Sequence, residues 1–196
     1  THPMMFTPYY GAWLEEKFYD VWQKMNKPEN FDLAEIAGGN GTLMRDILNA
    51  ALTKHPDFYA SLKPVEIVYA QGDLLLQQAA LRDHSQVRFL RGSAFETPLE
   101  DNSIQGIIFS NEMPDEFMPA FLETEDNGKT FKEIYISCAG DKISETCGDV
   151  SEAELISQYF EISGVKEKLA KNKKCGTILV NANIRYLAWQ KELARV

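Results

Sequence analysis

The sequence is poor in cysteine and histidine. Only three of each occur among its 196 residues. The cysteines, Cys138, Cys147 and Cys175, are odd in number and show no C-x-x-C spacing, which disfavours a disulfide framework and a zinc site. The histidines lie far apart and predict no metal centre. We therefore expect reduced thiols, no metal and an intracellular compartment.

Long apolar runs and an excess of positive charge are also missing. No stretch approaches the roughly twenty residues that cross a membrane, and the N-terminus lacks a signal-peptide pattern. The net charge is −9 at pH 7, from 20 Lys and Arg against 29 Asp and Glu. Binders of nucleic acid or of anionic membranes generally use a basic face. Both classes are disfavoured, whereas a cationic ligand or a basic protein substrate suits the acidic balance.

Alternating apolar patterns predict the fold. We expect strands over 31–36, 65–70, 87–90 and 104–110, and helices over 13–25, 42–54 and 73–83, with a polar connection over 57–64. Strands that alternate with helices form right-handed βαβ units. The predicted class is therefore α/β, with a Rossmann-like, mainly parallel sheet flanked by helices.

The pattern changes beyond residue 111, where we expect a small α+β insertion. The predicted elements are a loop passing into a short helix over 114–122, a hairpin of 131–138 with 142–146, a helix opened by a capping box of Ser151 and Glu154, a basic run over 166–174, an apolar segment over 177–180 and a final helix over 183–193. The length fits a single domain over 1–196. Within it we distinguish an N-terminal aromatic helix region (1–28), a nucleotide-binding βα core (29–125) and the insertion with C-terminal helices (126–196).

A glycine cluster follows the first predicted strand. Gly38, Gly39 and Gly41 lie in a strand-to-helix turn, where glycine can adopt positive φ and leaves room for a ligand against the backbone. The first N–H groups of the following helix point at such a ligand. A tight turn alone also favours glycine, so the plain structural interpretation stays open.

The spacing around this turn separates two nucleotide ligands. A dinucleotide site favours G-x-G-x-x-G, but Met44 stands where the third glycine is needed. S-adenosylmethionine has no phosphate and carries positive charge, so the acid Glu35 at the end of strand one suits it. In open α/β sheets, ligands bind at the carboxyl ends of the strands. The same edge should therefore collect the segments 69–73, 93–95 and 111–115.

Two motifs resemble a known family. The sequence E-I-A-G-G-N-G-T-L-M-R-D-I-L, from Glu35, resembles E-x-G-P-G-x-G-T-L-x-x-D-x-L of the MidA-type class I methyltransferases, which include the mitochondrial complex I assembly arginine methyltransferase. S-N-E-M-P-D-E-F, from Ser110, is similar to that family's A-N-E-F-F-D-A-L. Weaker similarities are found at Thr1–Pro3, at Tyr10 and Gly11, and at Lys132–Tyr135.

This resemblance implies a cofactor site. Glu35, Gly39 and Gly41 would hold S-adenosylmethionine, and Ala37 and Gly38 would shape the turn. The remaining residues that we assign to the cofactor site are Thr42, Tyr69, Asp73, Ser93 and Ala94.

The resemblance also implies a reaction. Asn111, Glu112 and Asp115 would lie beside the transferred methyl group and the incoming nucleophile. Carboxylates aim a guanidinium through paired hydrogen bonds, so we expect methylation of an accessible protein arginine. A role in respiratory complex assembly, in the cytoplasm or the mitochondrial matrix, follows from the same resemblance. Glu112 and Asp115 are alternatively acids that favour a helix N-terminus.

The chain also departs from the family pattern. Tyr69 occupies the place of an acid that binds the ribose hydroxyls, with Asp73 as a substitute from the next turn, and Met118 replaces a proline. No strand ending in D-Y-G follows, so we expect a member shortened at both ends. The alternative function is a catalytically inactive interaction or assembly module that uses the aromatic N-terminal helix and the basic run. A nicotinamide-dependent enzyme is the third possibility.

Overall fold

The computed structural model describes residues 7–171 and 177–196. The chain divides into two compact units, Thr1–Met113 with Glu192–Val196, and Pro114–Lys191. That the two units together form the single domain predicted over 1–196 stays a prediction. Thr1–Pro3, Cys175 and the end of the basic run lie outside the described residues.

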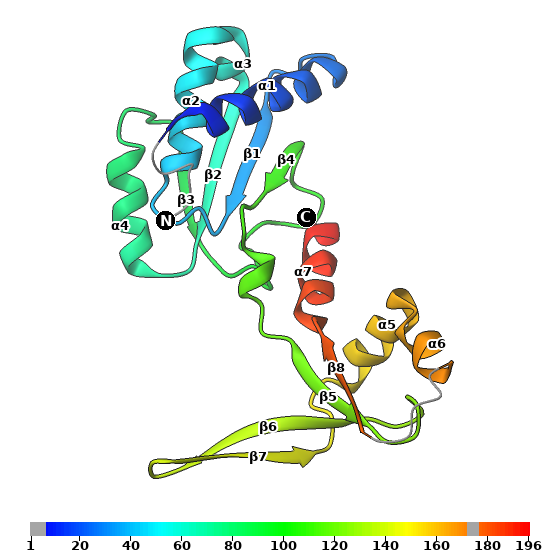
Figure 1. Ribbon diagram of the computed structural model, residues 1–196. Coiled ribbons are helices and arrows are strands. Elements are labelled where there is room, and N and C mark those ends of the chain that lie inside the picture. Colours follow the sequence, from blue (N-terminus) through cyan, green and yellow to red (C-terminus); the bar gives the residue numbers. More distant parts are fainter. Residues whose placement is uncertain (1–6, 172–176) are drawn as a thin grey trace. The chain divides into compact units, whose positions relative to one another are not determined.

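The first unit contains a four-stranded parallel sheet (Figure 1). Its strands are β1 (Phe31–Ile36), β2 (Leu62–Val68), β3 (Arg88–Arg91) and β4 (Gly106–Phe109). The order is β3-β2-β1-β4, and every neighbouring pair is parallel. The chain order therefore reverses between β1 and β4, the kind of position at which ligands bind in open α/β sheets. The predicted α/β class is confirmed.

The described part of this unit contains the helices α1 (Tyr9–Lys24), α2 (Thr42–Lys54), α3 (Pro56–Ser61) and α4 (Gln71–Ala80), together with the last turn of α7 (Ile184–Arg195). The polar connection that we predicted over 57–64 is wrong. Pro56 starts α3, because proline suits the first turn of a helix, and Phe58 is fully buried. Strand β2 already begins at Leu62, and Pro64 precedes the first residue that pairs with β3.

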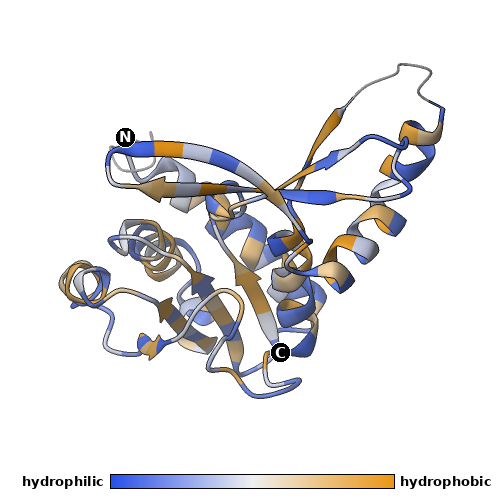
Figure 2. Ribbon diagram, turned by 90° about the horizontal axis from the view of Figure 1, so that it is seen from below, coloured by the Kyte–Doolittle hydropathy of each residue, from blue (hydrophilic) through white to orange (hydrophobic). Residues whose placement is uncertain are grey.

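The core of this unit lies between α1, α2, α3 and one face of the sheet. Trp22 and Phe31 both pack against Phe58, with ring centroids 5.4 and 5.8 Å apart. Helix α1 crosses α2 closely at Gly11, where a Cβ would lie 2.6 Å from the Cβ of Asp46. Most of the aromatic face of α1 is thus core, and Figure 2 shows hydrophobic residues along the strands of the parallel sheet. Trp13 remains 54% exposed.

The second unit is built on an antiparallel sheet of order β7-β6-β5-β8. Its elements are η2 (Pro114–Glu116), β5 (Ala120–Thr124), β6 (Lys132–Ala139), β7 (Lys142–Gly148), α5 (Ala153–Ser163), α6 (Val165–Ala170), β8 (Ile178–Ala182) and most of α7 (Ile184–Arg195). Stacked rings of Phe131 and Phe160, 4.4 Å apart, lie in its core. The predicted insertion and its hairpin are confirmed, and Cys138 and Cys147 on that hairpin are exposed.

Two local predictions for this unit are wrong. The segment expected to enter a helix by residue 122 forms strand β5, because Leu122 pairs with Val180, far away in the sequence. The capping box is also absent, since α5 begins after Glu152 without a side-chain cap. The backbone N–H of Ser151 instead donates to Glu133 Oε2 over 2.7 Å.

Within residues 7–171 and 177–196, no helix is long and apolar enough to cross a membrane.

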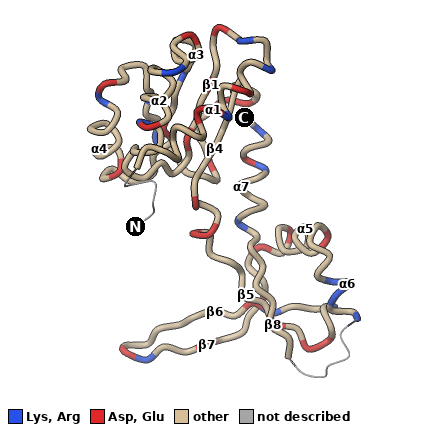
Figure 3. Tube along the Cα trace, turned by 45° about the horizontal axis from the view of Figure 1, so that its top comes forward, with Lys and Arg blue, Asp and Glu red and all other residues tan. Residues whose placement is uncertain are grey.

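Figure 3 shows acidic residues on the segment between β4 and β5, which contains Glu112, Asp115 and Glu116.

Candidate functional site

The glycine turn joins the end of β1 to the start of α2. Ala37, Gly39 and Gly41 all adopt left-handed backbone conformations, with φ of 61°, 55° and 79°. The Gly41 N–H donates to the carbonyl of Gly38 over 3.0 Å, and the Thr42 N–H donates to Asn40 Oδ1 over 3.1 Å. Asn40 therefore closes the turn with its side chain, a function that asparagine serves well at the start of a helix.

A hollow of about 400 Å³ lies against this turn. Seven of the residues predicted for the site line it: Glu35, Ala37, Gly38, Gly39, Thr42, Asp73 and Asn111. Asn40, Leu43 and Leu76 complete the lining. The hollow thus collects the carboxyl ends of β1 and β4 and the first turn of α4, as expected for the point where the strand order reverses.

Glu35 is an acid that lines this hollow, and it is only 2% exposed. Burial raises the pKa of its carboxyl from about 4.5 to about 7, although the neighbouring Glu66 carboxyl and the Met44 N–H oppose the shift. Met44 lies in the first turn of α2, whose positive end favours the ionised form of Glu35. Glu66 faces Glu35 from the next strand, and burial together with the charge of Glu35 raises the pKa of Glu66 well above its ordinary value.

Two polar atoms of the lining residues are buried without a partner. They are Glu35 Oε2, an acceptor, and Asn111 Nδ2, a donor. Buried polar groups are generally hydrogen-bonded, and an unpaired one costs about 1–3 kcal/mol. A ligand with a cationic group for Glu35 and an acceptor for Asn111 would satisfy both atoms.

Helix α4 supports the turn from the side. Gln77 is 1% exposed, and its Nε2 donates to the carbonyl of Gly39 over 3.0 Å. Gly41 lies so close to α4 that a Cβ there would approach the Cα of Gln77 to 3.0 Å. The sequence analysis missed Asn40, Glu66, Leu76 and Gln77. Asn40 lay within the glycine motif, whereas the positions of the other three depend on packing.

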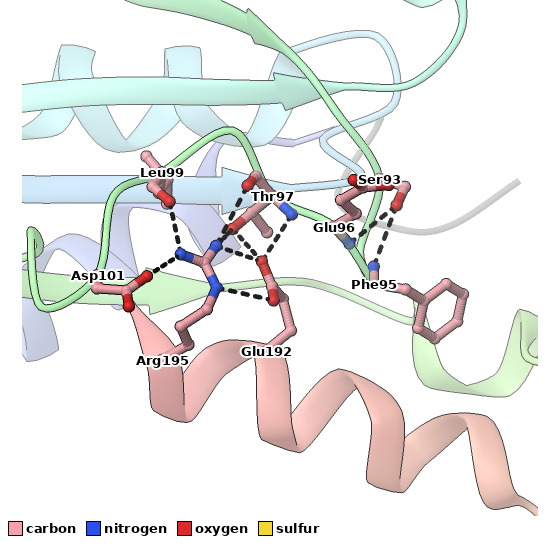
Figure 4. Close-up of polar contacts among 8 residues, drawn as sticks. All are labelled: Ser93, Phe95, Glu96, Thr97, Leu99, Asp101, Glu192 and Arg195. Atoms are coloured by element: carbon pink, nitrogen blue, oxygen red, sulfur yellow. Dashed lines mark hydrogen bonds and ion pairs between the residues drawn. The ribbon is translucent and has the colours of Figure 1, made fainter.

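Other predicted cofactor residues lie elsewhere. Tyr69 is 80% exposed and lines, with Ser93, a second hollow of about 540 Å³ beyond the ends of β2 and β3. Ser93 Oγ accepts hydrogen bonds from the N–H groups of Phe95 and Glu96, which shapes that loop (Figure 4). Neither Ala94 nor Gly41 is among the residues that line the two hollows.

The proposed catalytic acids are placed differently from Asn111. Glu112 follows Asn111 with a left-handed φ of 56°, and Asp115 lies in η2 at the start of the second unit. Neither acid lines the hollow beside the glycine turn. Their catalytic roles therefore stay predictions.

The C-terminal turn of α7 is fastened to the loop after β3 (Figure 4). Arg195 contacts Glu192 and Asp101, each over 2.6 Å, and also donates to the carbonyl of Leu99. Glu192 in turn accepts hydrogen bonds from the N–H and hydroxyl of Thr97, which lines the second hollow. Arg195 thereby lowers the pKa of Glu192 to about 2. Nothing in the sequence pattern predicted this network.

Within the described parts of the chain, no group of three or more His, Cys, Asp or Glu side chains is arranged to hold a metal ion.

Comparisons with known proteins identify a family and similar folds. The family model described as "Putative S-adenosyl-L-methionine-dependent methyltransferase" matches residues 14–193. A Burkholderia thailandensis protein described as a "likely methyl transferase", solved bound to S-adenosyl-homocysteine, has a TM-score of 0.61 and 15% identity over 92% of this chain and 43% of that chain. A structure of an uncharacterised superfamily member from the same organism has a TM-score of 0.64 and 13% identity, over 95% and 46% of the two chains.

At these identities the structural similarity concerns the fold. The chain spans less than half the length of either solved protein. No protein of curated function matches the sequence.

Proposed function

Because the chain belongs to the family described as "Putative S-adenosyl-L-methionine-dependent methyltransferase", we propose that the hollow beside the glycine turn binds S-adenosylmethionine for methyl transfer. The observation that carries this proposal is the pair of unpartnered buried atoms, Glu35 Oε2 and Asn111 Nδ2. They match the ammonium and carboxylate groups at the amino-acid end of the cofactor. S-adenosyl-homocysteine in the Burkholderia protein supports the same choice.

Asp73 supplies a further contact. It lines the hollow from the first turn of α4, whereas Tyr69, which stands where the MidA-type family has its ribose-binding acid, lines the other hollow. A carboxylate accepts hydrogen bonds from two neighbouring hydroxyls, so Asp73 is suited to hold the ribose. The position of Asp73 in the hollow therefore supports the proposal that Asp73 binds the ribose in place of the acid that the family has after β2.

The bound cofactor supplies a methyl group on a positively charged sulfur, and the chain's own residues supply position and orientation. The glycine turn brings the backbone close to the ligand, and Glu35 and Asn111 fix one end of it. Holding two reactants in line contributes several kcal/mol to catalysis, on the order of 7–11 kcal/mol in the best intramolecular cases. The hollow is therefore proposed to act mainly through positioning.

We further propose a protein arginine as the substrate. Glu112 and Asp115 provide two carboxylates in the segment after β4, and a guanidinium is bound through paired hydrogen bonds to such groups. The net charge of −9 suits a basic substrate. Assembly of a respiratory complex is the process that the MidA-type resemblance suggests.

Transfer of labelled methyl groups to peptides tests this function. We expect incorporation into an arginine-containing basic peptide and none into its lysine counterpart. Glu35→Arg should abolish incorporation, and the matched exposed variant Glu161→Arg, in α5, should retain it. Equal labelling of both peptides would contradict the arginine preference, and incorporation by Glu35→Arg would contradict the site.

An inactive interaction module is the second candidate. The exposed Tyr69 in place of an acid favours it, as do Ile136 and Ile143, which are 64% and 71% exposed on the β6–β7 hairpin. The aromatic face of α1 does not, because Phe18 and Trp22 are core residues. Turnover on any basic peptide would refute this candidate.

A further inference from the structure

One row of four side chains crosses the parallel sheet at the level of the hollow. Glu35 of β1 is in register with Glu66 of β2, Phe89 follows on β3, and Phe109 lies on the other side on β4. Residues in register on neighbouring parallel strands point to the same face. Two buried acids, 2% and 0% exposed, are therefore flanked by two phenylalanines.

Both carboxyl groups lie beside Gly38. A Cβ on residue 38 would collide with Glu66 Oε2 and would lie 3.1 Å from Glu35 Oε2. Glu35 Oε2 and both oxygens of Glu66 are buried without a hydrogen-bond partner. Two ionised carboxylates only accept hydrogen bonds, so a bond between them requires a proton on one of the two.

We propose that Glu66 is a positioning residue of the cofactor site, which keeps one proton of this buried pair and donates it to Glu35, leaving one negative charge for a cationic ligand. The inference rests on the proposed function and extends it to a residue of the sheet interior that does not line the hollow.

The surroundings favour a single charge. Nearby strands contribute Phe89 and Phe109, and α2 contributes the Met44 N–H. Asp73 of α4 is the other titratable residue that lines the hollow. Two adjacent carboxylates in such a site do not both ionise easily, as their charges repel.

The pKa directions agree with this arrangement. Glu35 titrates near pH 7, while the pKa of Glu66 is raised well above its ordinary value. Above pH 7 the pair has lost one proton and kept the other. Below pH 7 a cation must displace a proton from Glu35, so its affinity should fall about tenfold per pH unit.

Calorimetric titration with S-adenosyl-homocysteine, between pH 5.5 and 8.0 and in buffers of different ionisation enthalpy, tests the proposal. The wild type should lose affinity about 30-fold over this range and should release protons on binding near pH 6. Glu66→Gln cannot ionise but still donates to Glu35, and burial still raises the pKa of Glu35, so this variant should keep the wild-type affinity and pH profile. Glu66→Leu cannot donate, so the pKa of Glu35 should rise further and the loss of affinity should begin at higher pH. An unchanged pH profile in Glu66→Leu would overturn the proposal, since a merely structural role of Glu66 predicts that outcome.

A second measurement needs neither ligand nor variant. Carbon-detected NMR of the glutamate carboxyls in the ligand-free wild type should show two that remain largely protonated at pH 6. Titration of every described glutamate below pH 5.5 would contradict the inference. Absence of ligand binding at every pH, with two carboxyls still protonated, would instead refute the proposed function and leave the proton pair standing.

Discussion

Gln77 Nε2 lies 3.0 Å from the carbonyl oxygen of Gly39, so helix α4 holds the glycine turn through a side chain that is almost fully buried. The same helix presents Asp73 to the hollow. The glycine turn and α4 therefore support the proposed cofactor site together, and a substitution in α4 should change the affinity for the ligand.

Replacing Gln77 with alanine should loosen the turn. The Gly39 carbonyl loses its partner and a cavity forms, so the free energy of unfolding should fall by about 1–3 kcal/mol. Affinity for S-adenosyl-homocysteine should fall as well. Urea denaturation and calorimetry measure the two effects. Gln78→Ala, the exposed neighbour, is the control and should change neither.

Gly38→Ala should disrupt the acid pair. The added methyl group would collide with Glu66 Oε2, and overpacking of this kind costs about 1–3 kcal/mol. Gly72→Ala is the matched control, because no atom lies within 4 Å of its Cβ position and it belongs to α4. That control should be neutral or gain up to about 1 kcal/mol. Equal melting temperatures for the two variants would count against the close contact under Gly38.

Glu35→Gln should separate stability from binding. Burial raises the pKa of Glu35 to about 7, so the folded protein favours the protonated carboxyl. The stability that this gives is complete below the pKa of the unfolded chain, near 4.5, and is lost as the pH rises through 7. The amide has no such loss, so the variant should gain stability relative to the wild type between pH 5 and pH 8, by on the order of 1–3 kcal/mol. Its ligand affinity should nevertheless fall. Denaturation curves at both pH values measure the gain, and a constant difference would contradict the prediction.

Arg195→Ala should release the end of α7 from the loop after β3. The pKa of Glu192 is lowered to about 2, so its ionised carboxylate stabilises the folded protein above pH 4.5. This stabilisation is lost as the pH falls toward 2. We expect the melting temperature to fall by a few degrees at pH 7, and by less at pH 3. Arg82→Ala is a suitable control, because the side chain of Arg82 is 79% exposed and its ion pair with Asp83 is long, at 3.9 Å. A fall of the same size in the control would refute the role of the network.

The sequence was sufficient where local pattern decides structure. The apolar run at Phe31, the glycine cluster and the helix from Thr42 predicted the first βα unit, and they placed Glu35 at the end of its strand. Asp73 and Asn111 were placed at the same edge because parallel strands end together.

Where long-range packing decides, the sequence was insufficient. Leu122 lies in a strand that pairs with both β6 and β8, and Phe58 of α3 is buried among core residues from other elements. In the sequence, Glu66 is a single polar residue within an apolar strand. Its proposed role depends on the strand register that places it beside Glu35. No pattern within a single segment carries that information.

Calorimetric titration of the purified protein with S-adenosylmethionine at pH 8 tests the central claim most directly. We predict saturable binding at one site, its loss in Glu35→Arg, and unchanged binding in the exposed control Glu161→Arg. Absence of binding at millimolar ligand, or equal binding by Glu35→Arg, would contradict the assignment of the hollow beside the glycine turn.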